Sequence, residues 1–436
     1  MKVNFYRLAQ MSAAERLELC RGRGVNLGEL IPRVGPIIDE VRTRGDDAVR
    51  EFTRKFDGPD MDPLKFRVPS EWMDRAVNDL PRELRDAIET SITNIRKFHE
   101  HQLETPLWEM EISPGIIAGE KTVPIESVGL YIPRGKGSFP SMMMMAGVPA
   151  KVAGVDRIIV VTPPDSKGEA DVATVAAARI IGLTEVYAVG GVQAIAALAY
   201  GTKTIPRVDK IVGPGSGYVL AAKQLLSTEV DTGLPAGPSE AIILADKDSE
   251  PIMAVTDLLI EAEHGPDSSA YLVTPDPTLA EKALELIPPL VSKLPHDRRS
   301  FCETVLANSG GVVLAQNVDD AIDFINGFAP EHLQVLASEP EMILNNVKFA
   351  GETLLGPFTP GTLANYSIGP NAILPTSGFA RTASALSVRD FTRRMSFAKV
   401  TEEGFRRLAP KTLVLARYEG FPAHASALSL RLERET

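Results

Sequence analysis

Residues 157–212 read RIIVVTPPDSKGEADVATVAAARIIGLTEVYAVGGVQAIAALAYGTKTIPRVDKIV, and this stretch decides the fold class. The apolar, largely β-branched run 158–162 is followed by two prolines, which predicts a buried strand. The alanine-rich segment 169–181 ends at Gly182, which predicts a helix closed by glycine. The same alternation continues through 185–189, 192–200, 209–212 and 217–227. The stretch therefore predicts βαβ units that form a parallel sheet.

A second series of the same design follows. Its predicted strands are 241–245, 271–274, 311–315, 333–336 and 353–355, and its predicted helices are 250–263, 277–287 and 318–326. Before both series, residues 28–105 carry apolar stripes at helical spacing, such as Leu84, Ile88, Ile92 and Ile95. We therefore predict an α/β protein with two parallel-sheet units, flanked by smaller helical ends.

The composition narrows the class of protein. The chain has 436 residues, 44% of them hydrophobic, which is enough for two or more domains. Its net charge of −11 argues against a nucleic-acid or anionic-membrane partner, because both require a clustered basic surface. The first residues show no apolar h-region and no cleavage site, so we expect no signal peptide, and no apolar run reaches the roughly 18 residues that span a bilayer. Cys20 and Cys302 are isolated thiols. We expect a soluble cytoplasmic enzyme.

Carboxylates and imidazoles gather in three short segments. Glu331 and His332 are adjacent in 328–335, FAPEHLQV. Histidine titrates near neutral pH and glutamate can accept a proton from water, so this is a candidate proton-transfer pair. The other segments are 261–267, EAEHGPD, and 419–424, EGFPAH. Three of the six histidines of the chain lie in these segments.

Two glycine-rich turns follow predicted strands and precede predicted helices. They read VGGVQA at 189–194 and GPGSG at 213–217. Backbone N–H groups in such turns can face a pyrophosphate at a helix N-terminus. Neither turn has the full dinucleotide fingerprint, and no acidic residue occupies the ribose position. Nucleotide binding and ordinary tight turns both remain open on these features.

Glu261 and His264 suggest a metal site. At i and i+3 near a helix end they share one face, which suits two ligands of one cation, and the distant His424 could complete a zinc site. The alternative is a solvated glutamate beside a histidine that interacts with the helix dipole. The pair lacks the second histidine of a metalloprotease motif.

The chain resembles the histidinol dehydrogenase family over nearly its whole length. Eight segments match in order: 131–136 YIPRGK, 190–201 GGVQAIAALAYG, 208–215 VDKIVGPG, 235–240 PAGPSE, 262–268 AEHGPDS, 329–333 APEHL, 374–381 LPTSGFAR and 387–391 SVRDF. The resemblance implies a homodimer that uses NAD and Zn²⁺. It also implies an active site shared between subunits and oxidation of an alcohol through an aldehyde to a carboxylate.

The same resemblance implies the domain organisation. It predicts two incomplete Rossmann-like parallel-sheet domains with small helical N- and C-terminal extensions. The first domain is expected to be discontinuous, and the second to bind NAD. The predicted boundaries are 1–26 for the N-terminal extension, 27–130 plus 241–386 for the first domain, 131–240 for the second, and 387–436 for an extension exchanged in the dimer.

Roles for individual residues follow from the matching motifs. His332 is expected to take the alcohol proton, and Glu331 to activate water for attack on the aldehyde. Tyr131, Gln193 and Ser216 occupy cofactor positions. Ser239 and Glu419 occupy substrate positions, with Glu419 facing an ammonium group. The expected metal ligands are Glu261, His264, Asn365 and His424.

Several positions depart from the family pattern. Glu261 stands where the family has glutamine and Asn365 where it has aspartate, so one amide and one carboxylate are exchanged. Ala372 replaces a histidine, and Ser216 replaces an asparagine. Arg134 stands at a position often filled by glycine, and it could contact substrate.

We therefore predict an NAD- and zinc-dependent dehydrogenase with L-histidinol as the default substrate. The main alternative is a paralogue that acts on another small polar alcohol. One example is an anionic hydroxysulfonate held by Arg134 or Lys136. A non-catalytic zinc-binding homologue is disfavoured because Glu331 and His332 are both present. A metallohydrolase is disfavoured because no second motif combines a base with a metal ligand.

Overall fold

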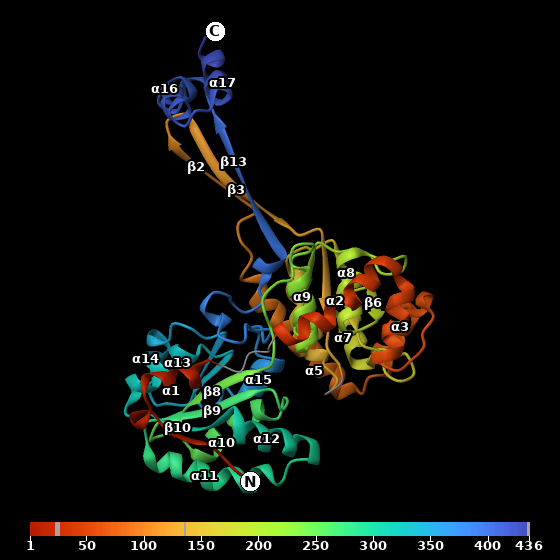
Figure 1. Ribbon diagram of the computed structural model, residues 1–436, viewed down its shortest axis with the longest axis vertical. Helices are drawn as coiled ribbons and strands as arrows, with labels where there is room; N and C mark the ends of the chain where they lie inside the picture. Colours follow the sequence, from red (N-terminus) through yellow and green to blue (C-terminus); the bar gives the residue numbers. More distant parts are fainter. Residues whose placement is uncertain (22–26, 135–136, 434–436) are drawn as a thin grey trace. The chain divides into compact units, whose positions relative to one another are not determined.

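A computed structural model describes residues 1–21, 27–134 and 137–433, and the chain divides into two units (Figure 1). The first unit comprises Met1–Gln102 and Ile125–Phe391, and the second comprises Leu103–Pro124 and Thr392–Thr436. Each unit is described here by itself. Among the described residues, no helix is both long enough and apolar enough to cross a membrane.

Residues 157–212 supply three of the four strands of a parallel sheet in the first unit, and the fourth strand precedes them in the chain. Its strand order is β6-β5-β4-β7, with bounds β4 Ser127–Tyr131, β5 Arg157–Thr162, β6 Glu185–Ala188 and β7 Lys210–Val212. The connecting helices are α6 Pro140–Val152, α7 Val172–Ile181, α8 Gly191–Tyr200 and α9 Gly217–Leu226. The order doubles back at β4, as in one half of a Rossmann fold.

Local sequence signals explain these elements. All but the first residue of β5 are buried, as expected for an apolar strand covered on both faces. Helix α7 begins where the side chain of Asp171 accepts a hydrogen bond from the Thr174 backbone N–H. It ends at Gly182, whose φ of 94° is a conformation that glycine adopts without strain. The predicted strand–helix alternation is confirmed, with bounds shifted by only a few residues.

A six-stranded parallel sheet forms the other half of the first unit. Its order is β1-β10-β9-β8-β11-β12. The bounds are β1 Phe5–Arg7, β8 Glu240–Leu244, β9 Ser269–Thr274, β10 Gly310–Leu314, β11 His332–Val335 and β12 Glu352–Leu355. Five of these strands again follow the Rossmann order, reversing beside β8. The fold class predicted from sequence is confirmed.

The helices around the six-stranded sheet include three that were not predicted from the sequence, at 296–308, 340–346 and 361–366. The elements are α1 Ala13–Cys20, α10 Pro251–Ala262, α11 Pro277–Val291, α12 His296–Asn308, α13 Val318–Phe328, α14 Pro340–Asn346 and α15 Gly361–Tyr366. Helix α12 begins with the charged run His-Asp-Arg-Arg and buries Cys302, Val305 and Leu306 only in its second half. Its apolar stripe is therefore too short to show a helical period in the sequence.

The structure corrects two expectations about which segments pack together. Helices α2 Leu27–Arg44, α3 Asp46–Phe56, α4 Ser70–Asp79 and α5 Arg82–Glu100 share one hydrophobic core with the four-stranded sheet. Residues 27–130 therefore pack mainly with the four-stranded sheet and not with the six-stranded one, because their apolar stripes cover helices α6–α9; of the segment 241–386, Ala372, Ile373 and Leu386 join this core. The first residues are not a separate extension either. Strand β1 pairs with β10, with Phe5 opposite Val312.

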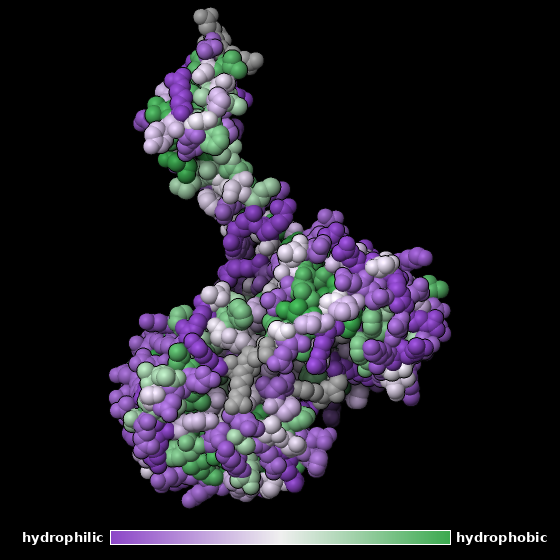
Figure 2. Space-filling model, in the orientation of Figure 1, coloured by the Kyte–Doolittle hydropathy of each residue, from purple (hydrophilic) through white to green (hydrophobic). Residues whose placement is uncertain are grey.

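The second unit has its own antiparallel sheet in the order β13-β3-β2. Its strands are β2 Leu107–Ser113, β3 Ile116–Pro124 and β13 Thr392–Val400, followed by helices α16 Glu402–Tyr418 and α17 Pro422–Leu432. The predicted C-terminal extension, 387–436, therefore did not include β2 and β3, which belong to this unit. The unit leaves large apolar side chains exposed, among them Trp108, Met110 and Leu415, and hydrophobic residues appear on its surface (Figure 2).

Candidate active site

A cavity of about 320 Å³ lies in the first unit, between loops of its two parallel sheets. From the four-stranded sheet, Arg134 follows β4 and Ser216 follows β7. From the six-stranded sheet, Ser239 precedes β8 and Glu331 precedes β11. The cavity therefore faces the carboxyl ends of one set of strands and the amino ends of the other. Only the first of these edges is the usual ligand edge of an open α/β sheet.

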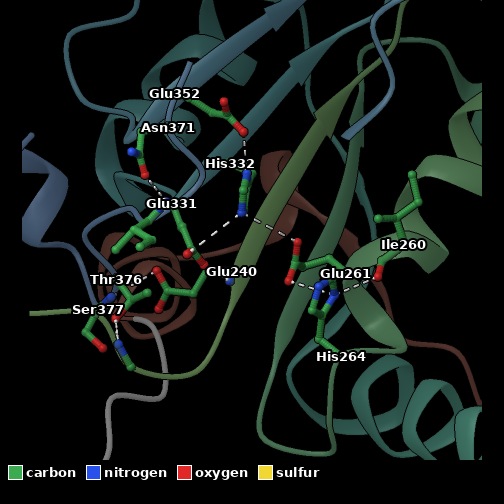
Figure 3. A network of polar contacts seen from close by, with 12 residues as sticks. Glu240, Ile260, Glu261, His264, Glu331, His332, Glu352, Asn371, Thr376 and Ser377 are labelled. Carbon is green, nitrogen blue, oxygen red and sulfur yellow. Dashed lines mark hydrogen bonds and ion pairs between the residues drawn. The ribbon is translucent and has the colours of Figure 1, made fainter. Parts of the chain in front are cut away.

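His332 is the first residue of β11 and lies at the centre of a group of carboxylates (Figure 3). Its Nδ1 lies 2.6 Å from Oε1 of Glu352. Its Nε2 lies 3.8 Å from Oε1 of Glu331 and 3.9 Å from Oε2 of Glu261. One ring nitrogen is therefore held by a hydrogen bond. The other faces two carboxylates at the cavity wall.

The backbone directs Glu331 and His332 toward this position. Helix α13 ends at Ala329, whose φ of 56° is in the left-handed region, and Pro330 then leads into β11. Such a φ is uncommon for alanine and often marks a functional turn. Oε2 of Glu331 accepts a hydrogen bond of 2.9 Å from the backbone N–H of Glu240. Oε2 of Glu240 in turn accepts one from the backbone N–H of Ser377.

The pKa values at this site reflect burial and crowded negative charge. Burial raises the pKa of Glu331 well above its usual value, against the lowering effect of His332. Burial also raises the pKa of Glu240 to about 7. For His332, burial lowers the pKa, but the nearby carboxylates of Glu331, Glu352 and Glu261 outweigh burial and raise it to about 10. A carboxyl group with a raised pKa is a stronger base near neutral pH.

Glu261 and His264 lie together at the end of α10, as their spacing predicts. His264 Nδ1 lies 3.2 Å from Oε1 of Glu261 and 2.8 Å from the carbonyl oxygen of Ile260. Nε2 of His264 is therefore the nitrogen left for a metal. Oε1 of Glu261 is buried and has no hydrogen-bond partner in the described part of the chain. Asn365, at the end of α15, lines the same cavity.

These residues fit part of a zinc site. A buried carboxylate oxygen that accepts no hydrogen bond, an imidazole nitrogen and an amide oxygen suit a divalent cation. Within the described residues, no group of three or more histidine, cysteine, aspartate or glutamate side chains is arranged to hold a metal. His424 lies in α17 of the second unit, and its place as a fourth ligand stays a prediction.

The predicted cofactor residues lie on the four-stranded sheet. The hydroxyl oxygen of Tyr131, at the end of β4, accepts a hydrogen bond of 3.2 Å from the backbone N–H of Gly191, and burial raises the pKa of Tyr131 to about 12. Nε2 of Gln193 donates to Oδ2 of Asp57 at 3.2 Å. Ser216 precedes α9 and lines the cavity. Tyr131 and Gln193 are buried and do not line the cavity.

The predicted substrate residues are dispersed. Ser239 and Ala372 line the cavity. Arg134 also lines it, but its Nη1 donates to the carbonyl oxygen of Glu169 at 2.7 Å, and its Nη2 lies 3.8 Å from Asp165. Glu419 follows α16 in the second unit, and its role in the site stays a prediction. Lys136 lies outside the described residues.

Three acidic residues near these groups were missed in the sequence analysis. They are Glu240, Glu352 and Asp57. Glu240 and Glu352 each open a strand of the six-stranded sheet, and a charged residue at the start of a buried strand is a signal that could have identified them. Asp57 gave no such signal, because it directly follows the charged helix α3.

Comparisons with known proteins agree on one family. A family model described as histidinol dehydrogenase matches residues 22–432. A histidinol dehydrogenase from Synechocystis is 48% identical over 98% of both chains. A "histidinol dehydrogenase homolog" from Rhizobium meliloti is 46% identical over 98% of this chain and 94% of that one.

Solved structures give the same result. A crystal structure of histidinol dehydrogenase from Elizabethkingia anophelis has a TM-score of 0.92 at 33% identity, covering 99% of this chain and 98% of that one. An acetylating aldehyde dehydrogenase from Geobacillus thermoglucosidasius has a TM-score of 0.50 at 12% identity, covering 89% and 96%. This second likeness concerns the fold alone.

Proposed function

Because the chain belongs to the histidinol dehydrogenase family and is a dehydrogenase, we propose that it oxidises L-histidinol through the aldehyde to the carboxylate with NAD and zinc. The reaction consumes one alcohol, one water and two NAD⁺, and it yields one carboxylate, two NADH and three protons. The observation that carries this proposal is the pair of Glu331 and His332 at one cavity wall, 3.8 Å apart.

His332 serves the first oxidation. Its Nε2 accepts the hydroxyl proton of the alcohol while the hydride leaves the adjacent carbon for NAD⁺. Hydride leaves readily only as the oxygen loses its proton, so a base at the hydroxyl is essential to this step. The hydrogen bond between Nδ1 and Glu352 orients the ring so that Nε2 lies on the side of Glu331, which lines the cavity.

Glu331 serves the second stage. Its buried carboxylate has a pKa raised well above the usual value, which suits a group that removes a proton from water near neutral pH. The activated water attacks the aldehyde carbon, and the hydrated aldehyde then gives up the second hydride. The hydrogen bond from the Glu240 N–H fixes the orientation of this carboxylate.

Glu261, His264, Asn365 and His424 are the residues that would hold zinc. The fit rests on the buried Oε1 of Glu261, which accepts no hydrogen bond within the described residues, and on Nε2 of His264. When bound, zinc supplies positive charge that orients the heteroatoms of the substrate and offsets the carboxylates around His332, which favours a neutral, proton-accepting imidazole.

The NAD site is proposed along the carboxyl edge of the four-stranded sheet. Tyr131 and the turn after β6 lie together there, and Ser216 opens helix α9 beside the cavity. Backbone N–H groups at a helix N-terminus favour a phosphate. Gln193 presents a buried Oε1 that has no partner within the described chain, so it can accept a hydrogen bond from the cofactor.

An amino alcohol fits the charge of the site better than an anionic substrate. The carboxylates of Glu261, Glu331 and Glu352 surround His332 at the cavity, Glu240 lies beside Glu331, and Glu419 is expected to add another carboxylate. Arg134, the cation proposed for a hydroxysulfonate, already donates to a backbone carbonyl group. We further propose a cytoplasmic homodimer. In it, Glu419 and His424 of a partner chain would complete the site.

A substrate panel tests this function. NADH formation is measured with L-histidinol, histidinaldehyde, other amino alcohols and a hydroxysulfonate, each with zinc present and after its removal. We expect the best rates with L-histidinol and zinc, at a kcat/KM of about 10⁴ M⁻¹s⁻¹ or more. A clear preference for another alcohol would instead identify a paralogue, because Ala372 and Asn365 alter the polar contacts of the site. No NADH with any alcohol would refute the proposal.

A further inference from the structure

Glu352 is a buried carboxylate that lies outside all eight segments of the family resemblance. Its side chain is 8% exposed, and its Oε1 accepts a hydrogen bond from Nδ1 of His332 at 2.6 Å. Its other oxygen, Oε2, is buried and has no hydrogen-bond partner within the described residues. Burying a carboxylate is costly unless it is paired. The hydrogen bond to His332 therefore stabilises the buried Glu352 carboxylate.

The sheet itself creates this contact. His332 and Glu352 are the first residues of β11 and β12, and they are register partners in the parallel pairing. Side chains of register partners in neighbouring strands lie on the same face of the sheet. A close approach of the two strand starts is possible because Gly351 precedes Glu352. A Cβ at Gly351 would lie 2.5 Å from the carbonyl oxygen of Glu331.

We propose that Glu352 is the positioning residue of His332, forming a carboxylate–imidazole pair that directs Nε2 at the alcohol proton. This inference rests on the proposed function. Nδ1–H donates to Glu352 throughout, so the lone pair for proton transfer is on Nε2. When the O–H bond of the alcohol breaks, the proton moves to Nε2, the hydride moves to NAD⁺, and Glu352 keeps its charge beside the new imidazolium. Carboxylates of serine-protease triads act in this way without being protonated.

The three carboxylates near His332 lie beside different ring nitrogens, and we therefore propose different functions for them. Glu331 and Glu261 lie on the Nε2 side at 3.8 and 3.9 Å, too far for a hydrogen bond to the ring. Glu352 alone of these three lies on the Nδ1 side (Figure 3). A purely structural Glu352 would stabilise the sheet edge and leave the tautomer of His332 unaffected.

The test compares the full-length zinc enzyme with Glu352→Gln and Glu352→Ala. Glutamine keeps an acceptor oxygen and loses the charge, whereas alanine loses both. We expect kcat for alcohol oxidation to fall roughly 10²- to 10⁴-fold in the alanine variant, and less in the glutamine variant, with KM changed less than about threefold. Glu341→Gln removes an exposed carboxylate from α14 and is the matched control, for which we expect unchanged kcat.

A second measurement reports on the hydrogen bond without relying on turnover. Protein labelled with ¹⁵N-histidine is examined by NMR, with His332→Asn used to assign the resonances of His332. We expect an Nδ1-protonated ring with a strongly downfield proton in the parent, and loss of that proton signal in Glu352→Ala.

The outcomes separate the two proposals. An inactive parent would refute the proposed function, while the NMR spectra would still decide whether Glu352 holds the ring. An active parent whose Glu352→Gln and Glu352→Ala variants keep kcat within about twofold would overturn the positioning role. An unchanged His332 spectrum in the folded alanine variant would overturn it as well. If the alanine variant does not fold, the kcat of the glutamine variant decides, and a value within about twofold of the parent overturns the positioning role.

Discussion

At the scale of single residues, the site depends on the positions of several glutamate side chains around the imidazole of His332. Glu352 binds Nδ1 of His332 directly, and Glu331 faces Nε2. Glu331 is also fixed by a backbone N–H, which leaves its other oxygen toward His332. Carboxylates of one chemical type therefore have different environments, and the proposed function gives them different roles. Single substitutions of these glutamates should therefore impair different steps of the reaction.

Glu331→Gln should separate the two oxidation stages. Glutamine retains the size of the side chain but cannot take a proton from water. We expect aldehyde oxidation to fall roughly 10²- to 10⁴-fold and alcohol oxidation to fall much less. His332→Asn should show the larger loss on the alcohol. Steady-state rates measured separately on histidinol and histidinaldehyde check this, and equal losses on both substrates in Glu331→Gln would contradict the division of labour.

His264→Ala should lose most of the bound zinc. Nδ1 of its imidazole is held by the carbonyl group of Ile260 and lies 3.2 Å from Oε1 of Glu261, which leaves Nε2 for the metal. Metal content measured by mass spectrometry after dialysis checks the prediction. His296→Ala is the control, because the His296 side chain is 92% exposed at the start of α12. Stoichiometric zinc in both variants would show that the metal lies elsewhere.

At the scale of elements, the site requires β12 to begin beside the carbonyl oxygen of Glu331, where a Cβ would clash. Gly351 lets β12 begin beside Glu331, and Glu352 follows at once. We expect Gly351→Ala to destabilise the protein by about 1–3 kcal/mol, since the added Cβ would meet a backbone oxygen. Denaturant unfolding measures the change. Gly35→Ala, where no atom lies within 4 Å of the new Cβ, should be neutral or slightly stabilising, and equal effects at both sites would refute the steric explanation.

The contact between α3 and α8 predicts a pH effect. Burial raises the pKa of Asp57 to about 6 from an ordinary value of 3.8, and the hydrogen bond from Gln193 only partly opposes this. A carboxyl group with a raised folded-state pKa stabilises the fold at low pH, and that contribution is lost as the pH rises from about 4 through 6.

Asp57→Asn should therefore gain stability relative to the parent as the pH rises. Because Asp57 is partly exposed, we expect a gain on the order of 1 kcal/mol between pH 4 and 7. Urea unfolding of both proteins at the two pH values measures it. A difference in free energy of unfolding that does not vary with pH would mean that the Asp57 carboxyl titrates normally.

At the scale of the whole molecule, the second unit carries apolar side chains that its own fold does not cover. Strand β2 exposes Leu107, Trp108, Met110 and Ile112, and Leu415 of α16 is 62% exposed. Contiguous exposed apolar side chains mark interaction surfaces. This agrees with the proposed homodimer, in which Glu419 and His424 reach the site of a partner.

We expect the enzyme to be a dimer whose activity depends on this unit. Met110→Glu combined with Leu415→Glu should shift the protein toward monomer and reduce histidinol oxidation, since buried charges without partners are costly. Analytical ultracentrifugation and NADH formation measure the two effects. Leu64→Glu, at an exposed position of the first unit, is the control. A dimer that survives the double substitution with full activity would place the interface elsewhere.

Local features of this protein could be read from its sequence. The apolar run of β5, the glycine that ends α7 and the i, i+3 spacing of Glu261 and His264 each involve residues within a few positions of one another. Their conformations follow from side-chain burial and backbone geometry over one turn or one strand. The same holds for the adjacent pair Glu331 and His332.

Only the tertiary structure decided which distant segments meet. Strand β1 lies beside β10, helices α2–α5 cover the four-stranded sheet, and Glu352 reaches a histidine 20 residues away. These contacts depend on strand register and on which apolar faces pack together, and a linear pattern leaves several pairings open. The sequence therefore determined the candidate base, whereas the register of two parallel strands determined the carboxylate that holds it.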